Sequence, residues 1–269
     1  MQNGPGAAWL VGNSQLITSL LAAYCSPEDQ RRASEDWSGR RVTRGALHVE
    51  PGHRFEFLAC NMQLLGEPAF SNNAVSASSA LLEFAGLIEP APRVIVLMLR
   101  GNEFAMESLV DDRPHWDFSY PGMPATPGRQ LLRARDVAAH FARVMEPTLA
   151  MCLLYRHTYP QAQIYHVAAP PPIESQQHIL EQPEVFGELL AEQGLRPFEL
   201  RLKIYQALYQ PLAERLAGFG VQTLFAPAQS LTPAGGLRSE FASGCLHGNH
   251  AYGRALMADL LARGIHASV

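Results

Sequence analysis

The stretch Ala7-Ala8-Trp9-Leu10-Val11-Gly12-Asn13-Ser14 contains the feature from which the fold is best predicted. Its first five residues are apolar and a glycine ends the run, which predicts a short buried strand over residues 8–12. A helical pattern begins directly afterwards, over residues 16–25. Ser14 therefore stands where a strand turns into a helix. Backbone amides at such a helix start are free to bind an anion, and the helix dipole favours negative charge there.

Four more short apolar runs bounded by turn residues predict buried strands over residues 54–59, 93–99, 163–169 and 221–226. Further helical patterns cover residues 78–88, 136–159, 183–218 and 252–263, and the second of them should be interrupted or bent near Pro147. Alternating strands and helices predict an α/β protein with a three-layer, flavodoxin-like fold, in which helices flank a five-stranded, mainly parallel sheet. We expect one domain over residues 1–269, with a long loop near residues 104–129 and a helical excursion near residues 183–218.

Composition excludes several classes of function. The formal net charge is −4 and the basic residues are scattered, which argues against a nucleic-acid partner. No apolar run reaches the ~18 residues of a membrane span, so we expect no membrane partner. The N-terminus lacks the features of a signal peptide, and if Met1 is the native start we expect a cytoplasmic protein. The four cysteines are widely spaced with no CxxC pair, which predicts free buried thiols and no metal site.

Two further motifs occur at predicted element ends. Arg100-Gly101-Asn102-Glu103 follows the strand predicted over residues 93–99, and His247-Gly248-Asn249 precedes the last helix. A side-chain amide can donate a hydrogen bond to an oxyanion, and an imidazole is a general base near neutral pH. Each motif alone has a structural explanation: a serine that caps a helix, an asparagine in a turn, and a histidine in a loop. Together with Ser14 they supply the groups that ester hydrolysis needs.

With these three motifs the chain resembles the SGNH hydrolases, also called the GDSL family, over nearly its whole length. Gly12-Asn13-Ser14 is similar to the block of the nucleophile, and Asn102 to the block of the oxyanion asparagine. His247 is similar to the block of the base, and its tail resembles the His-x-Asn-x-x-Tyr-Gly variant of some uncharacterised bacterial members. The resemblance implies that Ser14, Asn102 and His247 are catalytic.

Two positions depart from that pattern. The oxyanion glycine is expected near residues 74–78, where no glycine occurs, so a backbone amide of Ala77 or Ser78 would have to replace it. The aspartate expected three residues before His247 is Gly244. Glu240, Ser243 or a backbone carbonyl would then have to orient the imidazole, or the site is weak or inactive.

Residues of the predicted loops are candidates for the walls of a substrate pocket at the same sheet edge as Ser14, because ligands gather at the carboxyl ends of parallel strands. These candidates are Gln15, Arg100, His115, Trp116 and Tyr120. The aromatic members would stack on a sugar ring or would fill a core beneath the loop.

The leading hypothesis is a serine esterase or acyl-transfer enzyme without a cofactor, and the resemblance suggests small acyl esters, such as acetyl groups on a carbohydrate. The first alternative is a catalytically weak or inactive protein that keeps the pocket and binds a ligand. The second is a nucleotide-binding flavodoxin-like domain, which the single glycine after the first strand disfavours. The sequence predicts no oligomeric state.

Overall fold

A six-stranded sheet forms the centre of the protein in a computed structural model that describes residues 7–39, 41–50, 52–89, 91–99 and 102–266. The strand order is β10-β9-β6-β1-β3-β2, and every neighbouring pair is parallel except β2 with β3. Five of the strands were predicted: β1 (Ala7–Gly12), β3 (His53–Ala59), β6 (Pro92–Met98), β9 (Gln163–Val167) and β10 (Val221–Leu224). The predicted α/β class with a mainly parallel sheet is therefore confirmed.

The sixth strand, β2 (Thr43–Glu50), was missed in the sequence. It pairs only with β3 at one edge of the sheet, and Thr43 and Leu47 are its buried residues, while Arg44 is exposed. An edge strand with one solvated face alternates apolar and polar residues instead of forming an apolar run. A search for continuous apolar runs passes over such a pattern.

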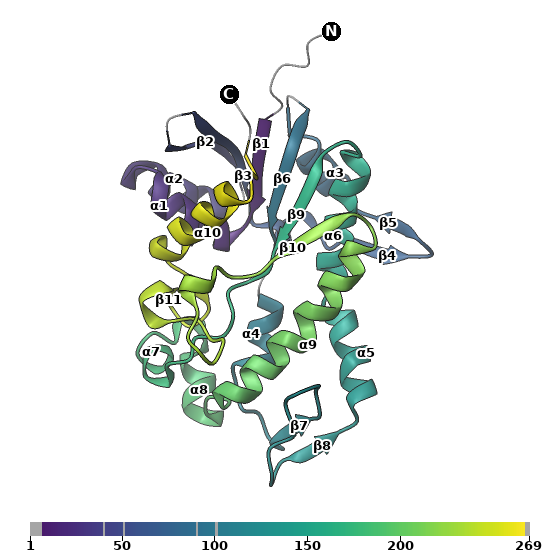
Figure 1. The fold of residues 1–269 in the computed structure, drawn as a ribbon, viewed down its shortest axis with the longest axis vertical. Helices are drawn as coiled ribbons and strands as arrows, with labels where there is room; N and C mark the ends of the chain where they lie inside the picture. The colour runs from purple at the N-terminus through teal and green to yellow at the C-terminus, as the bar shows by residue number, and fades with distance from the viewer. Residues whose placement is uncertain (1–6, 40, 51, 90, 100–101, 267–269) are drawn as a thin grey trace.

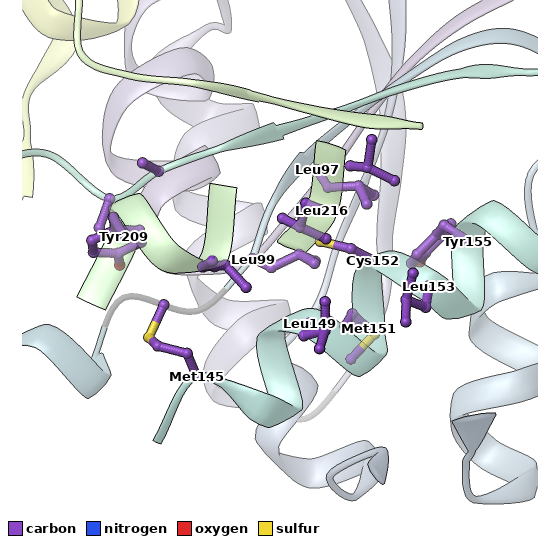
Figure 2. Packing of buried hydrophobic residues seen from close by; sticks show 14 of the residues in the cluster. Leu97, Leu99, Met145, Leu149, Met151, Cys152, Leu153, Tyr155, Tyr209 and Leu216 are labelled. Atoms are coloured by element: carbon purple, nitrogen blue, oxygen red, sulfur yellow. The ribbon is translucent and has the colours of Figure 1, made fainter. Parts of the chain in front are cut away.

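Two hydrophobic clusters cover the two faces of the sheet, because successive side chains of a strand point to opposite faces. Trp9 and Val11 of β1 belong to one cluster, and Ala8 and Leu10 of the same strand belong to the other. Figure 2 shows part of the first cluster, in which Leu97 of β6 packs with residues of two helices. The structure therefore has three layers, as predicted (Figure 1).

Helices supply both outer layers. The cluster of Trp9 is covered by α3 (Ser79–Ala85), α5 (Ala134–Val144), α6 (Glu146–Thr158) and α9 (Phe198–Ala217). The cluster of Leu10 is covered by η1 (Leu16–Leu21), α2 (Pro27–Ser38) and α10 (His250–Ala262), and α1 (Ala22–Tyr24) continues η1.

The structure divides each of the two long helical predictions into shorter helices, and for the first it confirms the predicted interruption near Pro147. The predicted helix over residues 136–159 is broken at Met145 into α5 and α6, which are bent by 46°. Pro147 lies in the first turn of α6, where a missing amide hydrogen is tolerated. The region 183–218 is also not one helix, because a turn with Gly194 at φ 90° separates η3 (Glu184–Phe186) and α8 (Gly187–Gln193) from α9.

The remaining elements are short, and several lie beyond the carboxyl ends of the parallel strands, below the sheet in Figure 1. Those beyond the carboxyl ends include α4 (Asn102–Ser108), β7 (Trp116–Phe118), β8 (Gln130–Leu132), α7 (Gln176–Glu181) and β11 (Ala242–Ser243). The short elements also include η2 (Met62–Leu65), β4 (Ala69–Ser71), β5 (Ala74–Ser76), η4 (Ala228–Ser230), η5 (Ser239–Phe241) and β12 (His247–Gly248), which pairs with β11. In the described part of the chain, no single helix is long and apolar enough to cross a membrane; α5 and α6 meet those criteria only as a bent pair.

Candidate active site

The turn after β1 places Ser14 at the carboxyl edge of the sheet. Gly12 pairs with Met98 of β6, and the helical turn begins at Ser14 and continues into η1. A Cβ atom on Gly12 would lie 2.8 Å from the Leu16 Cβ and 2.9 Å from the Met98 carbonyl oxygen, so no larger residue fits. The Asn13 side chain accepts a hydrogen bond from the Gln15 amide at 3.4 Å. The sequence Gly-Asn-Ser therefore makes a tight strand-to-helix turn that ends in a serine.

His247 lies next to Ser14 in the structure, although the two residues are 233 positions apart in the sequence. The His247 Nε2 atom lies 3.2 Å from the Ser14 Oγ atom, within hydrogen-bond distance. The backbone holds His247 in place, because β12 pairs with β11 and His247 lies directly opposite Ser243. Both side chains are partly exposed, so a substrate can approach them. A hydroxyl and an imidazole in this geometry are suited to nucleophilic catalysis.

The residues after His247 fix its position. The Asn249 side chain caps α10 by accepting hydrogen bonds from the amides of Ala251 (2.8 Å) and Tyr252 (3.2 Å). Its Nδ2 atom donates to the carbonyl oxygens of Glu240 (2.9 Å) and Ala242 (3.0 Å). One asparagine therefore ties the helix that follows His247 to the strand that pairs with it.

Gly253 lets α10 approach η1, the helix that follows Ser14. A Cβ atom on Gly253 would overlap the backbone carbonyl of Ser19 in η1, well inside 3.0 Å. Ser19 in turn donates a hydrogen bond to the Gln15 carbonyl oxygen at 2.5 Å. In the His-x-Asn-x-x-Tyr-Gly tail, Asn249 therefore caps α10 and Gly253 allows α10 to pack closely on η1.

Burial tunes the imidazole toward its neutral form. Desolvation lowers the pKa of His247 below the usual value of 6.5, and the negative charge of Glu184 opposes part of that shift. A lowered pKa leaves the ring unprotonated at neutral pH, and only the unprotonated ring can accept a proton from Ser14.

Glu184 was not predicted as a site residue. It belongs to η3, and its carboxylate occupies the space where a Cβ atom at Gly244 would lie. The Glu184 Oε2 atom accepts hydrogen bonds from the Cys245 amide and the Cys245 thiol, each at 3.4 Å. Nearby, the His178 Nε2 atom of α7 lies 3.1 Å from the Gly244 carbonyl oxygen. No local pattern links residues 184 and 247, so the only clue in the sequence was the glycine at position 244.

The other orienting candidates have structural contacts of their own. The Glu240 carboxylate lies 3.9 Å from the Arg238 guanidinium, and its carbonyl oxygen accepts from Asn249. Ser243 meets His247 through the strand pairing. Ser78 caps α3, because its hydroxyl accepts from the Leu81 amide at 3.1 Å and donates to the Leu65 carbonyl. Ala77 directly precedes that cap and packs against the first hydrophobic cluster.

Two candidate residues, Asn102 and Arg100, lie partly or wholly outside the described residues. Asn102 begins α4 four residues after the end of β6, so Asn102 and Ser14 follow the carboxyl ends of two neighbouring parallel strands, β6 and β1. The side chain of Asn102 and the whole of Arg100 lie outside the described residues.

Gln15 is 5% exposed, and within the described part of the chain its Nε2 atom has no hydrogen-bond partner. Glu103 is buried and accepts a hydrogen bond from the Thr148 hydroxyl at 3.4 Å.

The aromatic loop packs on the first hydrophobic cluster. Phe118 is a buried member of that cluster, and Trp116 and Tyr120 are half-buried against it. The Arg196 guanidinium lies over the Trp116 ring, 4.3 Å from its centre. The Tyr120 hydroxyl donates to the Gln206 carbonyl of α9 at 3.3 Å. The structure thus supports the interpretation in which these rings fill a core beneath the loop.

A buried ion pair anchors the same loop. The Lys203 ammonium lies 2.8 Å from Asp117 and also donates to the carbonyl oxygens of Phe118 (3.2 Å) and Pro124 (2.7 Å). Asp117 is fully buried, and it also accepts from the amides of Phe118 (2.6 Å) and Thr126 (2.7 Å). His115 lies at the loop's edge, where its Nδ1 atom is 3.3 Å from Asp111.

The cysteines are free thiols, of which Cys60, Cys152 and Cys245 are buried and Cys25 is partly exposed. Burial and the Glu184 carboxylate raise the pKa of Cys245 to about 12, so it is a protonated donor. Among the residues that the structure describes, no group of three or more His, Cys, Asp or Glu side chains is arranged to hold a metal ion.

No protein-family model matches the chain, and no curated protein matches its sequence. Among solved structures, a protein from Streptococcus pneumonia, provisionally described as a platelet activating factor, is 15% identical, with 98% of this chain and 86% of that chain covered and a TM-score of 0.45. The periplasmic domain of a lipopolysaccharide acetyltransferase from Salmonella ser. Paratyphi A is 11% identical, with 98% and 85% covered and a TM-score of 0.45. Likenesses this distant carry no inference about activity, so the site must be interpreted from its own residues.

Proposed function

We propose that the protein is a serine esterase or acyl-transfer enzyme that acts on small acyl esters. The observation that carries the proposal is the 3.2 Å contact between the Ser14 hydroxyl and the His247 imidazole at the carboxyl edge of the sheet. The tight turn at Gly12 and the docking of α10 at Gly253 both serve that contact. This edge is also where open parallel sheets bind their ligands.

The reaction proceeds in two acyl transfers. The Ser14 Oγ atom attacks the ester carbonyl carbon while His247 Nε2 takes the hydroxyl proton. The tetrahedral intermediate collapses, the carbon–oxygen bond to the alcohol breaks, and the leaving alcohol takes the proton from His247. Water, or a second alcohol in a transferase, then attacks the acyl-serine by the same steps and releases Ser14.

The developing oxyanion needs hydrogen-bond donors, each worth up to roughly 10²–10³ in rate. The backbone amide of Ser14 is one candidate, because it lies at the start of a helical turn. Asn102 is the second, since it follows the carboxyl end of β6, the strand that pairs with β1. The amides of Ala77 and Ser78 stay candidates for the third donor.

The resemblance to SGNH hydrolases suggests a small acyl group, such as an acetyl group on a carbohydrate. Trp116 and Tyr120 remain the candidates for contacts with a sugar only through their partly exposed surfaces. The cytoplasmic location stays a prediction.

Hydrolysis of p-nitrophenyl acetate tests the proposal. We expect turnover by the native protein and its loss in both Ser14→Ala and His247→Ala. His250→Ala is the matched control, because His250 is an exposed histidine three residues further on. A native rate no higher than that of Ser14→Ala would contradict the esterase function and favour the inactive ligand-binding alternative.

A further inference from the structure

The turn that carries His247 lacks a carboxylate of its own. Gly244, three residues before His247, has φ 59°, a left-handed conformation that suits glycine. An imidazole that takes a proton in catalysis gains from a nearby carboxylate, which holds the ring and stabilises its charged form. Neither Glu240, which lies beside Arg238, nor any residue of β11 supplies that carboxylate.

A carboxylate does reach this turn, from another part of the chain. Glu184 places its carboxyl carbon and both oxygens where a side chain at position 244 would begin. Two hydrogen bonds from Cys245 hold it there. Its backbone has φ 51°, which is uncommon for a residue with a side chain and is kept only where the surroundings fix it.

We infer that Glu184 is the positioning residue of the proposed Ser14–His247 pair, and that it replaces from a separate segment the carboxylate that position 244 lacks. The inference rests on the proposed function for its catalytic meaning. Glu184 holds the turn through Cys245, and its negative charge favours the imidazolium that forms when His247 takes the proton of Ser14. The other titratable groups at this turn are the Cys245 thiol and His178, which contacts the Gly244 carbonyl.

Position 244 and position 184 therefore share one space. An aspartate at 244 in the native background would collide with the Glu184 carboxylate. In a background without Glu184 that space is open, and an aspartate at 244 would bring a carboxylate back to it. Aspartate is also among the residues that best tolerate the left-handed conformation.

The experiment compares Glu184→Gln, Glu184→Asp and the double variant Glu184→Ala with Gly244→Asp. Glu188→Gln is the matched control, because it removes the same charge from an exposed residue one turn further along the excursion. We measure kcat/KM for p-nitrophenyl acetate across pH, the melting temperature, and the pKa of His247 by NMR titration of the ring.

We expect Glu184→Gln to lose at least about tenfold in kcat/KM, compared with ~10⁴ for the buried aspartate of a serine protease. The pKa of His247 should fall, because Glu184 raises it in the native protein. Glu184→Asp and the double variant should recover part of both losses, which a purely structural role would not explain.

Unchanged kcat/KM together with an unchanged His247 pKa in Glu184→Gln would overturn the inference. So would a loss that Glu188→Gln matches. The NMR titration needs no turnover, and it separates the two proposals. If the native protein hydrolyses no ester but Glu184→Gln still lowers the His247 pKa, the esterase function fails while the coupling of the two side chains stands.

Discussion

Adding a single methyl group at position 253 should separate the two halves of the site. In Gly253→Ala the new Cβ atom would lie well under 3.0 Å from the Ser19 carbonyl, whereas ordinary contacts begin at 3.4 Å. The obstacle is backbone on both sides, so the methyl group cannot be accommodated by rotating a side chain, and α10 must move away from η1 by about 1 Å to restore an ordinary contact. Overpacking of this kind costs about 1–3 kcal/mol of folding free energy.

The same movement should also reduce the proposed esterase activity, because His247 lies three residues before α10 and Ser14 lies two residues before η1. The 3.2 Å contact between them is already near the upper limit for a hydrogen bond. A misplacement of about 1 Å can cost on the order of 10² in rate. We therefore expect Gly253→Ala to lower the melting temperature by roughly 2–10 °C and kcat/KM by up to about 100-fold.

Thermal unfolding and p-nitrophenyl acetate hydrolysis measure the two effects. Gly86→Ala is the control, since Gly86 ends α3 with a right-handed backbone and a Cβ atom there would meet its nearest neighbours at 3.4 Å. We expect this control to keep native activity and stability. If Gly253→Ala matched Gly86→Ala in both assays, the close approach of α10 to η1 would not be what positions His247.

Four further outcomes are expected. Since burial lowers the pKa of His247, kcat/KM should rise with pH through a midpoint below 6.5; a midpoint at or above that value would contradict a desolvated base. Lys203→Met should cost about 3–5 kcal/mol in urea unfolding, because Asp117 keeps its amide hydrogen bonds but loses its buried counter-charge. Burial raises the pKa of Asp117, but hydrogen bonds, first of all the one from Lys203, lower that pKa below its usual value of 3.8. The stabilisation from the Asp117–Lys203 pair should therefore be lost only as pH falls through the lowered pKa of Asp117. The Lys203→Met protein should lose less stability over the same pH range. Asn249→Ala should cost about 1–2 kcal/mol and lower kcat/KM, as an N-cap is lost and two carbonyl groups lose their donor; unchanged stability would show that water replaces the cap.

The sequence predicted the parts of the fold whose signal is local. The central strands β1 and β6 are apolar runs with turn residues at their ends, and all five segments predicted as strands are strands. The strand β2 was missed because only one of its faces is buried, so that its sequence does not form a continuous apolar run. The break between α8 and α9 was missed because Gly194 and Pro197 stand inside a helical pattern that continues on both sides.

For the candidate site, too, only the residues with a local sequence signal were predicted. Ser14 and His247 were predicted because short motifs at element ends mark them, and the structure places them within hydrogen-bond distance. Glu184 carries no such mark: its position depends on a left-handed backbone and on contacts with Cys245, 61 residues away. Trp116 and Tyr120 are residue types that often line pockets. Only the structure shows that both pack against the first hydrophobic cluster beneath the loop.

The hydrogen bond between Ser14 and His247 joins residues 233 positions apart, which has a consequence for folding. A contact between residues far apart in the sequence costs loop-closure entropy before it contributes any stabilisation, so such contacts tend to form late in folding. Because α10 packs on η1, we expect the two chemical groups to meet only when these two helices dock. Appearance of activity during refolding should therefore follow the slowest assembly step, and partly folded chains with a finished N-terminal half should be catalytically silent.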